Sequence, residues 1–169
     1  MNVLEAIESR ISVRKYTGER ITKEELDTLL YAGFCAPSAM NRRPWQFVVV
    51  QDPQTLQDIA DHGNYTKMMP QAGTCIVVCG DQNVTQIPEL LTNDCSAAIQ
   101  NILLAARGIG LGTVWCGMVK NQEFYQYVHD RLDLPEHVVP EGLIAVGYPA
   151  EHREHPERFE ADKVHFEKW

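Results

Sequence analysis

The spacing of apolar and polar residues predicts a chain that alternates helices with short strands. The predicted helices cover residues 3–9, 22–36, 53–62, 89–107 and 121–131, and the predicted strands cover residues 45–50, 75–79, 111–118 and 142–147. The second helix opens with a capping box, in which Thr22 and Glu25 satisfy each other's backbone amides. It stops before Pro37, because the residue preceding a proline is driven out of helical geometry.

The helix predicted over residues 89–107 has apolar positions all round its circumference. They are Leu90, Leu91, Cys95, Ala97, Ala98, Ile99, Ile102, Leu103, Leu104, Ala105 and Ala106. A helix without a polar face is buried, either in a core or at an interface between subunits. Gly108 and Gly110 end it.

The segment after Pro149 differs from the rest of the chain. Charged residues dominate it, yet large apolar residues recur at Phe159, Val164, Phe166 and Trp169. Disordered tails seldom carry so many large apolar side chains, and the chain offers no further helix or strand for them to pack on. We therefore expect one domain over residues 1–169, whose extended tail, residues 150–169, packs on a second subunit.

Composition and charge exclude several classes of protein. The chain has 169 residues, 44% of them hydrophobic, with a net charge of −8 and an isoelectric point near 5.2. This negative net charge repels phosphate backbones, so nucleic acid is not an expected partner. An anionic ligand would need a local cluster of basic residues. No apolar run approaches the roughly 20 residues of a membrane-spanning helix, and the amino terminus lacks the pattern of a secretory signal.

Cysteine usage points to a reducing compartment. The five cysteines are odd in number and lie in apolar segments, so without an export signal we expect reduced thiols in the cytoplasm. A zinc site on Cys75 and Cys79 is not expected, because in a strand these residues lie about 13 Å apart and no further ligand pair stands nearby. No metal is predicted.

The first candidate site follows the first helix, at Arg10, Ser12 and Arg14. In extended backbone alternate residues point the same way, so these three side chains share one face while Ile11 and Val13 turn to the core. Two guanidinium groups around a hydroxyl suit a phosphate or the carbonyl-rich edge of a ring. The alternative is a solvated basic patch.

Three further segments carry candidate polar groups. They are the loop 36–45 with Ser38 and Asn41, the turn with Asn64 and Lys67, and the strand end 110–117. Each also has a purely structural interpretation, as a helix-to-strand connector with an Asx turn, a surface turn and a buried strand end. Glycine in the last segment permits close approach by a planar ligand, although the GxGxxG fingerprint of dinucleotide folds is absent.

Taken in order, these segments resemble the nitroreductase family of flavin-dependent oxidoreductases. The matching stretches are Arg10-x-Ser12-x-Arg14-x-Tyr16, Ala36-Pro37-Ser38-x-x-Asn41-x-x-Pro44-Trp45-x-Phe47, Asn64-x-x-Lys67, Asp94, Gln100-Asn101-Ile102-Leu103-Leu104-Ala105-Ala106, Gly110-Leu111-Gly112 and Gly147-Tyr148-Pro149. Each piece alone is modest, but the ordered set covers the whole chain and is specific. The short length and the ending from Arg158 to Trp169 are similar to the compact branch of the family.

The resemblance implies an α+β fold, in which a mainly antiparallel four-stranded sheet is flanked by helices. The long apolar helix would be central to a homodimer, and the C-terminal tail would wrap the partner and add a strand to its sheet. Two FMN molecules would lie at the dimer interface, each contacted by both subunits.

The resemblance also assigns cofactor-binding roles. Arg10 and Ser12 match positions that bind the FMN phosphate, joined by Arg158 from the tail. Arg14 and Lys67 match positions beside the N1 and O2 edge of the isoalloxazine ring. A fixed cation there stabilises the negative charge that two-electron reduction places on that edge.

Seven further positions complete the implied site. Asn64 matches a residue that hydrogen-bonds the flavin or its ribityl chain; Pro37, Ser38 and Asn41 match the loop that the other subunit lays against the cofactor; Trp115, Cys116 and Gly117 match the stretch whose backbone faces the ring near N5 and O4.

Two departures from the family pattern stand out. Arg43 takes the place of a frequent glutamine before Pro44, so the contact made by that glutamine is not carried over. In the tail, Glu157 stands where a second basic residue would help to bind the phosphate, and Arg153 is the alternative source of that charge.

These assignments predict an enzyme that passes hydride from NAD(P)H, through flavin N5, to an oxidised acceptor such as a nitroaromatic or quinone in a ping-pong cycle. The cofactor carries the chemistry, so no catalytic side chain is predicted. Two alternatives remain: a flavin-storage or regulatory protein without nicotinamide turnover, and a redox-sensing thiol protein centred on Cys35 or Cys116. The sequence selects neither the acceptor nor between NADH and NADPH.

Overall fold

A four-stranded antiparallel sheet, in the order β1-β2-β4-β3, lies at the centre of the computed structural model, which describes residues 1–120, 122–151 and 158–169. The strands are β1 (Trp45–Val50), β2 (Thr74–Asp81), β3 (Gly112–Gly117) and β4 (Val138–Gly147). The predicted α+β fold is confirmed. Strand β4 begins at Val138 rather than at the predicted residue 142, because β2 and β4 stay paired beyond a bulge at Val78/Cys79.

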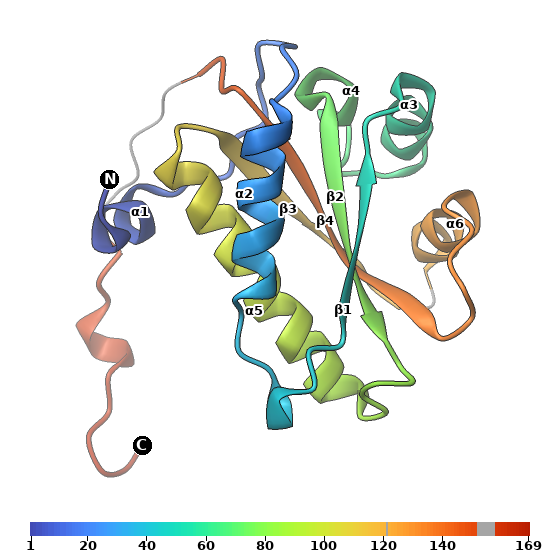
Figure 1. Ribbon diagram of the computed structural model, residues 1–169. Helices are drawn as coiled ribbons and strands as arrows, with labels where there is room; N and C mark the ends of the chain where they lie inside the picture. Colours follow the sequence, from blue (N-terminus) through green and yellow to red (C-terminus); the bar gives the residue numbers. More distant parts are fainter. Residues whose placement is uncertain (121, 152–157) are drawn as a thin grey trace.

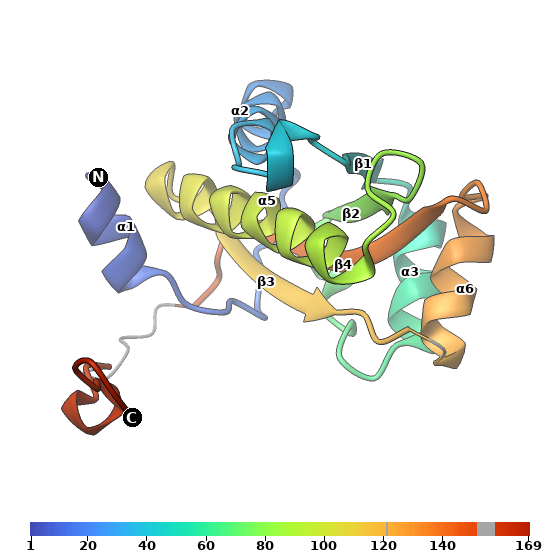
Figure 2. The same cartoon turned by 90° about the horizontal axis from the view of Figure 1, so that it is seen from below.

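Helices cover both faces of this sheet (Figures 1 and 2). Helices α2 (Lys23–Phe34) and α5 (Pro88–Gly108) lie on one face, while α3 (Pro53–His62), α4 (Met69–Ala72) and α6 (Glu123–Arg131) lie on the other. Helix α1 (Val3–Ser9) packs against α5, and two short 3₁₀ helices, η1 (Ala39–Asn41) and η2 (Ala161–Lys163), complete the described elements.

The central strand β2 is covered by helices on both faces of the sheet, which explains its continuously apolar sequence. In β2, Cys75, Val77 and Cys79 belong to the core under α3, α4 and α6, whereas Ile76 and Val78 belong to the core under α2 and α5. All five side chains are fully buried. Successive side chains of a strand point to opposite faces, so a strand covered on both sides has no polar position.

Helix α5 has one broad buried face, and several apolar side chains on its other face are only half-buried. The buried positions are Leu91, Asp94, Cys95, Ala98, Ile99, Ile102, Leu103 and Ala106. Leu90, Ala97, Leu104 and Ala105 are only half-buried in the single chain. Part of the all-round apolar surface predicted from the sequence therefore remains available to another chain.

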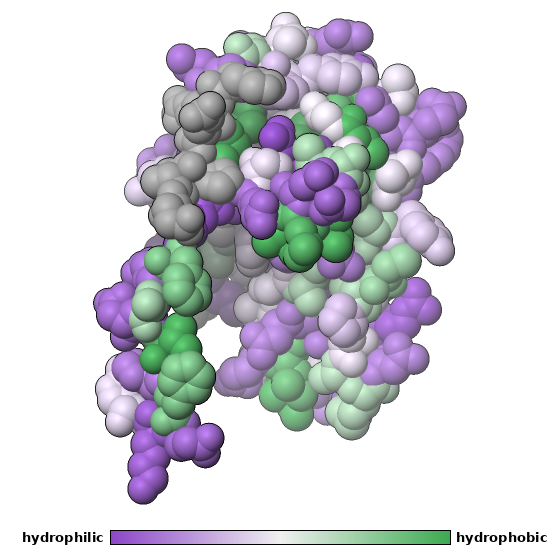
Figure 3. All heavy atoms as spheres, turned by 90° about the vertical axis from the view of Figure 1, so that its left-hand side faces the viewer, coloured by the Kyte–Doolittle hydropathy of each residue, from purple (hydrophilic) through white to green (hydrophobic). Residues whose placement is uncertain are grey.

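The two ends of the chain are apolar and exposed. In α1, Val3 and Leu4 are 66% and 65% exposed. In the tail, Phe166 and Trp169 are 84% and 101% exposed. Figure 3 shows the described tail as a separate column of atoms beside the body, with apolar side chains on its surface.

Candidate functional site

The segment after α1 runs along β3, which is an edge strand of the sheet. Ser12 bridges Thr113 in parallel sense, and the Val13 N–H donates to the Thr113 carbonyl at 2.9 Å. The close approach needs Gly112, because a Cβ there would stand 2.9 Å from Val13 Cγ1. Val13 is buried and Arg14 is exposed, as the predicted alternation requires, whereas Arg10, Ile11 and Ser12 are all half-buried.

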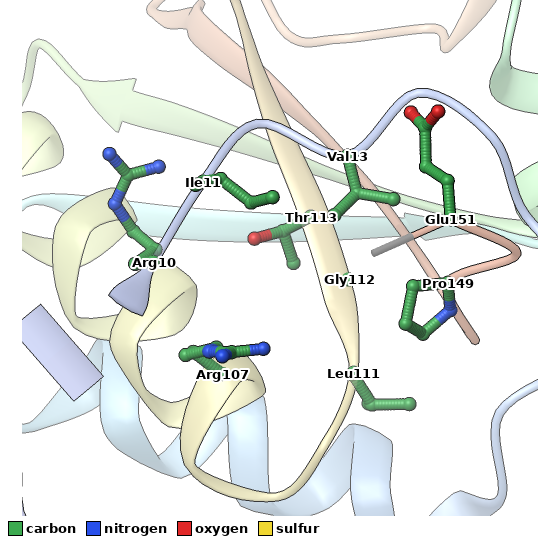
Figure 4. Close-up of a pocket in the computed structure, with 9 residues that line it drawn as sticks. All are labelled: Arg10, Ile11, Val13, Arg107, Leu111, Gly112, Thr113, Pro149 and Glu151. Atoms are coloured by element: carbon green, nitrogen blue, oxygen red, sulfur yellow. The ribbon is translucent and has the colours of Figure 1, made fainter. Parts of the chain in front are cut away.

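Three arginines gather at one end of this segment. Arg10 and Arg107, together with the carboxylate residue Glu151, line a cavity of about 30 Å³ beside β3 (Figure 4). It has room for about two water molecules or for part of a small anion. The guanidinium of Arg158 donates to the Arg10 carbonyl over 3.4 Å. Burial and the neighbouring charge of Arg158 lower the pKa of Arg10. Like charges held together in an acidic protein form a cluster that an anion would stabilise.

Arg107 was not among the residues predicted from the sequence. It lies in the last turn of α5, where a basic side chain ordinarily interacts with the carbonyls of its own helix. In the structure its Nε donates instead to the Ser9 hydroxyl at 2.8 Å, across 98 residues of sequence. Sequence spacing around Arg107 gives no indication of this contact with Ser9 at the end of α1.

The other end of the segment meets the end of β3. The positive charge of Arg14 acts to lower the pKa of the Cys116 thiol, but burial dominates and raises that pKa to about 11. The thiol donates to the Tyr65 carbonyl at 3.2 Å, which joins β3 to the turn that contains Asn64 and Lys67. A thiol with a raised pKa stays protonated near neutral pH and is a weak nucleophile, which argues against Cys116 as a redox centre.

Strand β3 ends in an open surface. Trp115 is 38% exposed, and its indole covers Gly142, where a Cβ would stand 2.6 Å from Nε1. A Cβ on Gly117 would meet no atom of the described residues within 4 Å. A flat ligand can therefore lie directly against the backbone at Gly117.

Lys67 and Asn64 have other neighbours within the chain. The Lys67 ammonium donates to the Ala60 carbonyl at 2.8 Å, so it neutralises the partial negative charge at the end of α3. Asn64 lines a separate cavity of about 550 Å³, together with His62 and Tyr127, whose rings stack at 3.6 Å. The ammonium keeps donors for a further ligand, but its position is set by α3.

The loop with Pro37, Ser38 and Asn41 stands apart from the arginine cluster. The Ala39 N–H donates to Asp94 of α5 at 2.9 Å, whereas the arginine cluster meets the same helix at Arg107. The 13 residue steps from Asp94 to Arg107 span about 20 Å at the rise of an α-helix. One chain therefore does not bring this loop to the arginine cluster.

Several other expectations are resolved or left open by the described residues. Arg43 is exposed, and its backbone N–H donates to the Ser38 hydroxyl at 2.9 Å. Arg153 and Glu157 lie outside the described residues. Over the described ranges, no three histidine, cysteine or acidic side chains are placed to share a metal ion, and no helix is long and apolar enough to cross a membrane.

The arrangement suits an elongated ligand with a phosphate at one end and a flat ring at the other. The four residue steps from Arg10 to Arg14 cover about 13 Å in extended geometry. They lead from the arginine cluster to the open backbone at the end of β3, where Arg14 supplies a positive charge.

Comparison with known proteins gives consistent matches. A sequence model described as the Nitroreductase family matches residues 7–64 and 62–148. A protein from Methanothermobacter thermautotrophicus, named "Putative NADH dehydrogenase/NAD(P)H nitroreductase", is 41% identical over 169 residues, covering 100% of this chain and 88% of the relative. A solved structure of the same name from Parabacteroides distasonis has a TM-score of 0.95 and 38% identity over 100% of both chains. A "putative nitroreductase in complex with fmn" from Desulfovibrio desulfuricans has a TM-score of 0.86 and 31% identity, covering 100% of this chain and 98% of that chain.

Proposed function

The chain belongs to the nitroreductase family, and from that premise we propose that it is a homodimeric, FMN-dependent oxidoreductase. It takes hydride from NAD(P)H and passes it, in a ping-pong cycle, to an oxidised acceptor such as a nitroaromatic or a quinone. FMN is its cofactor. The observation that carries the proposal is the line of Arg10, Ser12 and Arg14 along β3, from the arginine cluster to the open surface at Gly117.

The residues along this line fit FMN. The guanidinium groups of Arg10, Arg107 and Arg158 offer fork-shaped donors to a phosphate, and the lowered pKa of Arg10 marks a group whose charge an anion would relieve. At the other end, no described residue comes within 4 Å of the position that a Cβ on Gly117 would take.

FMN, when bound, supplies the hydride chemistry, so the proposed site needs no side-chain acid or base. The chain supplies placement. The arginine cluster would hold the phosphate, Arg14 would supply a positive charge at the ring end, and the open surface beside Trp115 would let donor and acceptor bind in turn.

A second copy of the chain completes the proposed site. The loop with Pro37, Ser38 and Asn41 is fixed to α5 about 20 Å from the arginine cluster of its own chain, and we assign its contact with the cofactor to the partner chain. The exposed apolar residues of α1 and of the tail supply surface for such an interface. We place the dimer in the cytoplasm, which suits five free thiols.

Reduction of the bound flavin tests the function. The purified protein should be yellow, anaerobic NADH or NADPH should bleach the visible flavin band, and a nitroaromatic or quinone should restore it. Steady-state assays with both donors identify the preferred nicotinamide. Bound flavin that neither donor bleaches would replace the enzyme with the flavin-storage alternative, and a protein that binds no flavin would overturn the proposal.

Replacing Arg14 should lower the flavin midpoint potential. Arg14→Ala removes a positive charge that already acts on the neighbouring Cys116 and Tyr16 side chains. A loss of about 1.5–3 kcal/mol corresponds to roughly 30–60 mV for a two-electron couple, with slower reduction by NAD(P)H. Spectroelectrochemical titration measures the shift. Arg14→Lys should keep the flavin midpoint potential close to that of the wild type, and Lys15→Ala, at an exposed position, is the control. An unchanged midpoint potential in flavin-replete Arg14→Ala contradicts the proposed effect of the Arg14 charge on the flavin.

A further inference from the structure

We propose that Asp94 and Asn101 form a two-point clamp on α5, which fixes the 37–43 loop in the conformation that it presents to a second copy of the chain. Asp94 is the principal positioning residue. The clamp is a property of the single chain; its effect on the cofactor rests on the proposed function.

The backbone of the 37–43 loop adopts an unfavourable conformation. Met40, Asn41 and Arg43 have φ angles of 53°, 54° and 55°, in the left-handed region that residues with a Cβ seldom occupy. Within the loop, the Ser38 carbonyl accepts the Asn41 N–H at 3.0 Å and the Ser38 hydroxyl accepts the Arg43 N–H at 2.9 Å. Such conformations persist where surrounding structure imposes them.

Asp94 supplies a bond between this loop and the core. Asp94 is only 6% exposed, and its Oδ1 accepts the Ala39 N–H at 2.9 Å. No group in the described part of the chain bonds Oδ2. A buried carboxylate with one bonded oxygen is costly to keep among apolar neighbours, and the contact that it makes is the one to the loop.

Asn101 fixes the entry to the same loop. Its Nδ2 donates to the Ala32 carbonyl in the last turn of α2, at 3.0 Å. Seven residues separate Asn101 from Asp94, so both side chains lie on one face of α5, two turns apart. Between α2 and α5 the packing is tight, because a Cβ on Gly33 would stand 3.1 Å from Ile102 Cδ1. The end of α2 and the loop that follows are thus held by one rigid helix.

Limited proteolysis of the cofactor-free protein tests the clamp directly. Trypsin can cut after Arg42, whereas the Arg43–Pro44 bond resists it, so the fragment ending at Arg42 reports opening of the loop. We expect this cut to be at least about 5-fold faster in Asp94→Ala, and near the wild-type rate in Asp94→Asn, whose amide oxygen still accepts the Ala39 N–H.

Asp52→Ala is the matched control. Asp52 caps α3 by accepting the Thr55 N–H at 2.8 Å, so its loss lowers stability without touching the loop. If cleavage after Arg42 is no faster in Asp94→Ala than in Asp52→Ala at equal distance below each Tm, the clamp is overturned.

A second variant removes the donor instead of the acceptor. Ala39→Pro deletes the N–H and leaves Asp94 in place, and Ser38 is already extended at φ −143° and ψ 154°, as the residue before a proline must be. It should open the loop as Asp94→Ala does. This keeps the inference testable where Asp94→Ala does not fold; a closed loop in Ala39→Pro contradicts it.

The effect on the cofactor is a separate measurement. In Asp94→Ala the Kd for FMN should rise about 10-fold, the scale of one lost hydrogen bond to a buried group, and the visible circular dichroism of bound flavin should change; both should recover in Asp94→Asn. Faster cleavage with unchanged FMN binding and dichroism would overturn the role of the clamp at the cofactor. A wild-type protein that binds no FMN would refute the proposed function while leaving the proteolysis result intact.

Discussion

Removing residues 152–169 is expected to turn a yellow dimer into a colourless monomer or an aggregate. The shortened chain ends at Glu151. It therefore keeps the hydrogen bond from the Ala150 N–H to the Lys15 carbonyl at 2.9 Å and the Lys15–Glu151 ion pair at 3.7 Å. The folded body of the chain should therefore survive. What is lost is Arg158 at the arginine cluster and the apolar surface of the tail.

The size of the effect follows from the aromatic side chains. Phe166 and Trp169 are fully or almost fully exposed in the single chain, and each can bury about 150–250 Å² at an interface. At about 25 cal/mol per Å², that is roughly 4–6 kcal/mol per side chain before the cost of association. Two such side chains from each tail would make the largest single contribution to the dimer that the described tail offers.

Light scattering and flavin absorbance of one preparation measure both outcomes. Arg158→Ala should weaken FMN binding while leaving a dimer, and Phe166→Ser with Trp169→Ser should weaken the dimer while leaving Arg158 in place. A truncated protein that remains a yellow, well-behaved dimer would show that the tail is dispensable, and the exchanged-tail architecture would have to be abandoned.

Elements defined by local pattern could be predicted from the sequence. The capping box at Thr22 and Glu25 begins α2 as expected, and the apolar run of β2 is buried on both faces of the sheet. The alternation predicted from Arg10 to Arg14 is clear only at Val13, which is buried, and Arg14, which is exposed, because these residues lie beside the edge strand in extended backbone.

Features that depend on distant contacts could not be predicted in the same way. Arg107 donates a hydrogen bond to Ser9, and Lys67 donates one to the Ala60 carbonyl at the end of α3. In both cases the acceptor belongs to a different element from the donor, so local sequence spacing does not indicate the contact. The hydrogen bond between Ala39 and Asp94 joins two matching stretches of the family pattern that are 55 residues apart. Motif order identified both stretches, but only the fold shows that they touch.

Replacing Arg10 should weaken FMN binding by roughly 10- to 150-fold. Arg10 is the C-cap residue of α1, so its backbone is fixed by the bond from its own N–H to the Ala6 carbonyl at 3.0 Å. Its side chain lines the cavity that Arg107 shares, and the charge of Arg158 beside it favours an anionic ligand. Loss of a charge-assisted bond to phosphate costs about 1.5–3 kcal/mol, which gives that range of Kd.

Riboflavin separates the phosphate contact from every other effect of Arg10→Ala. Riboflavin has the same ring and ribityl chain as FMN but no phosphate, so fluorescence titration of the cofactor-free protein should show weaker FMN binding and unchanged riboflavin binding. Arg10→Lys keeps the charge but loses the two-pronged geometry, and should fall between wild type and Arg10→Ala. Arg20→Ala, an exposed arginine away from the cavity, is the control for net charge. Equal loss of both ligands would mean that Arg10 supports the fold of the site, and unchanged FMN affinity would remove Arg10 from the phosphate site.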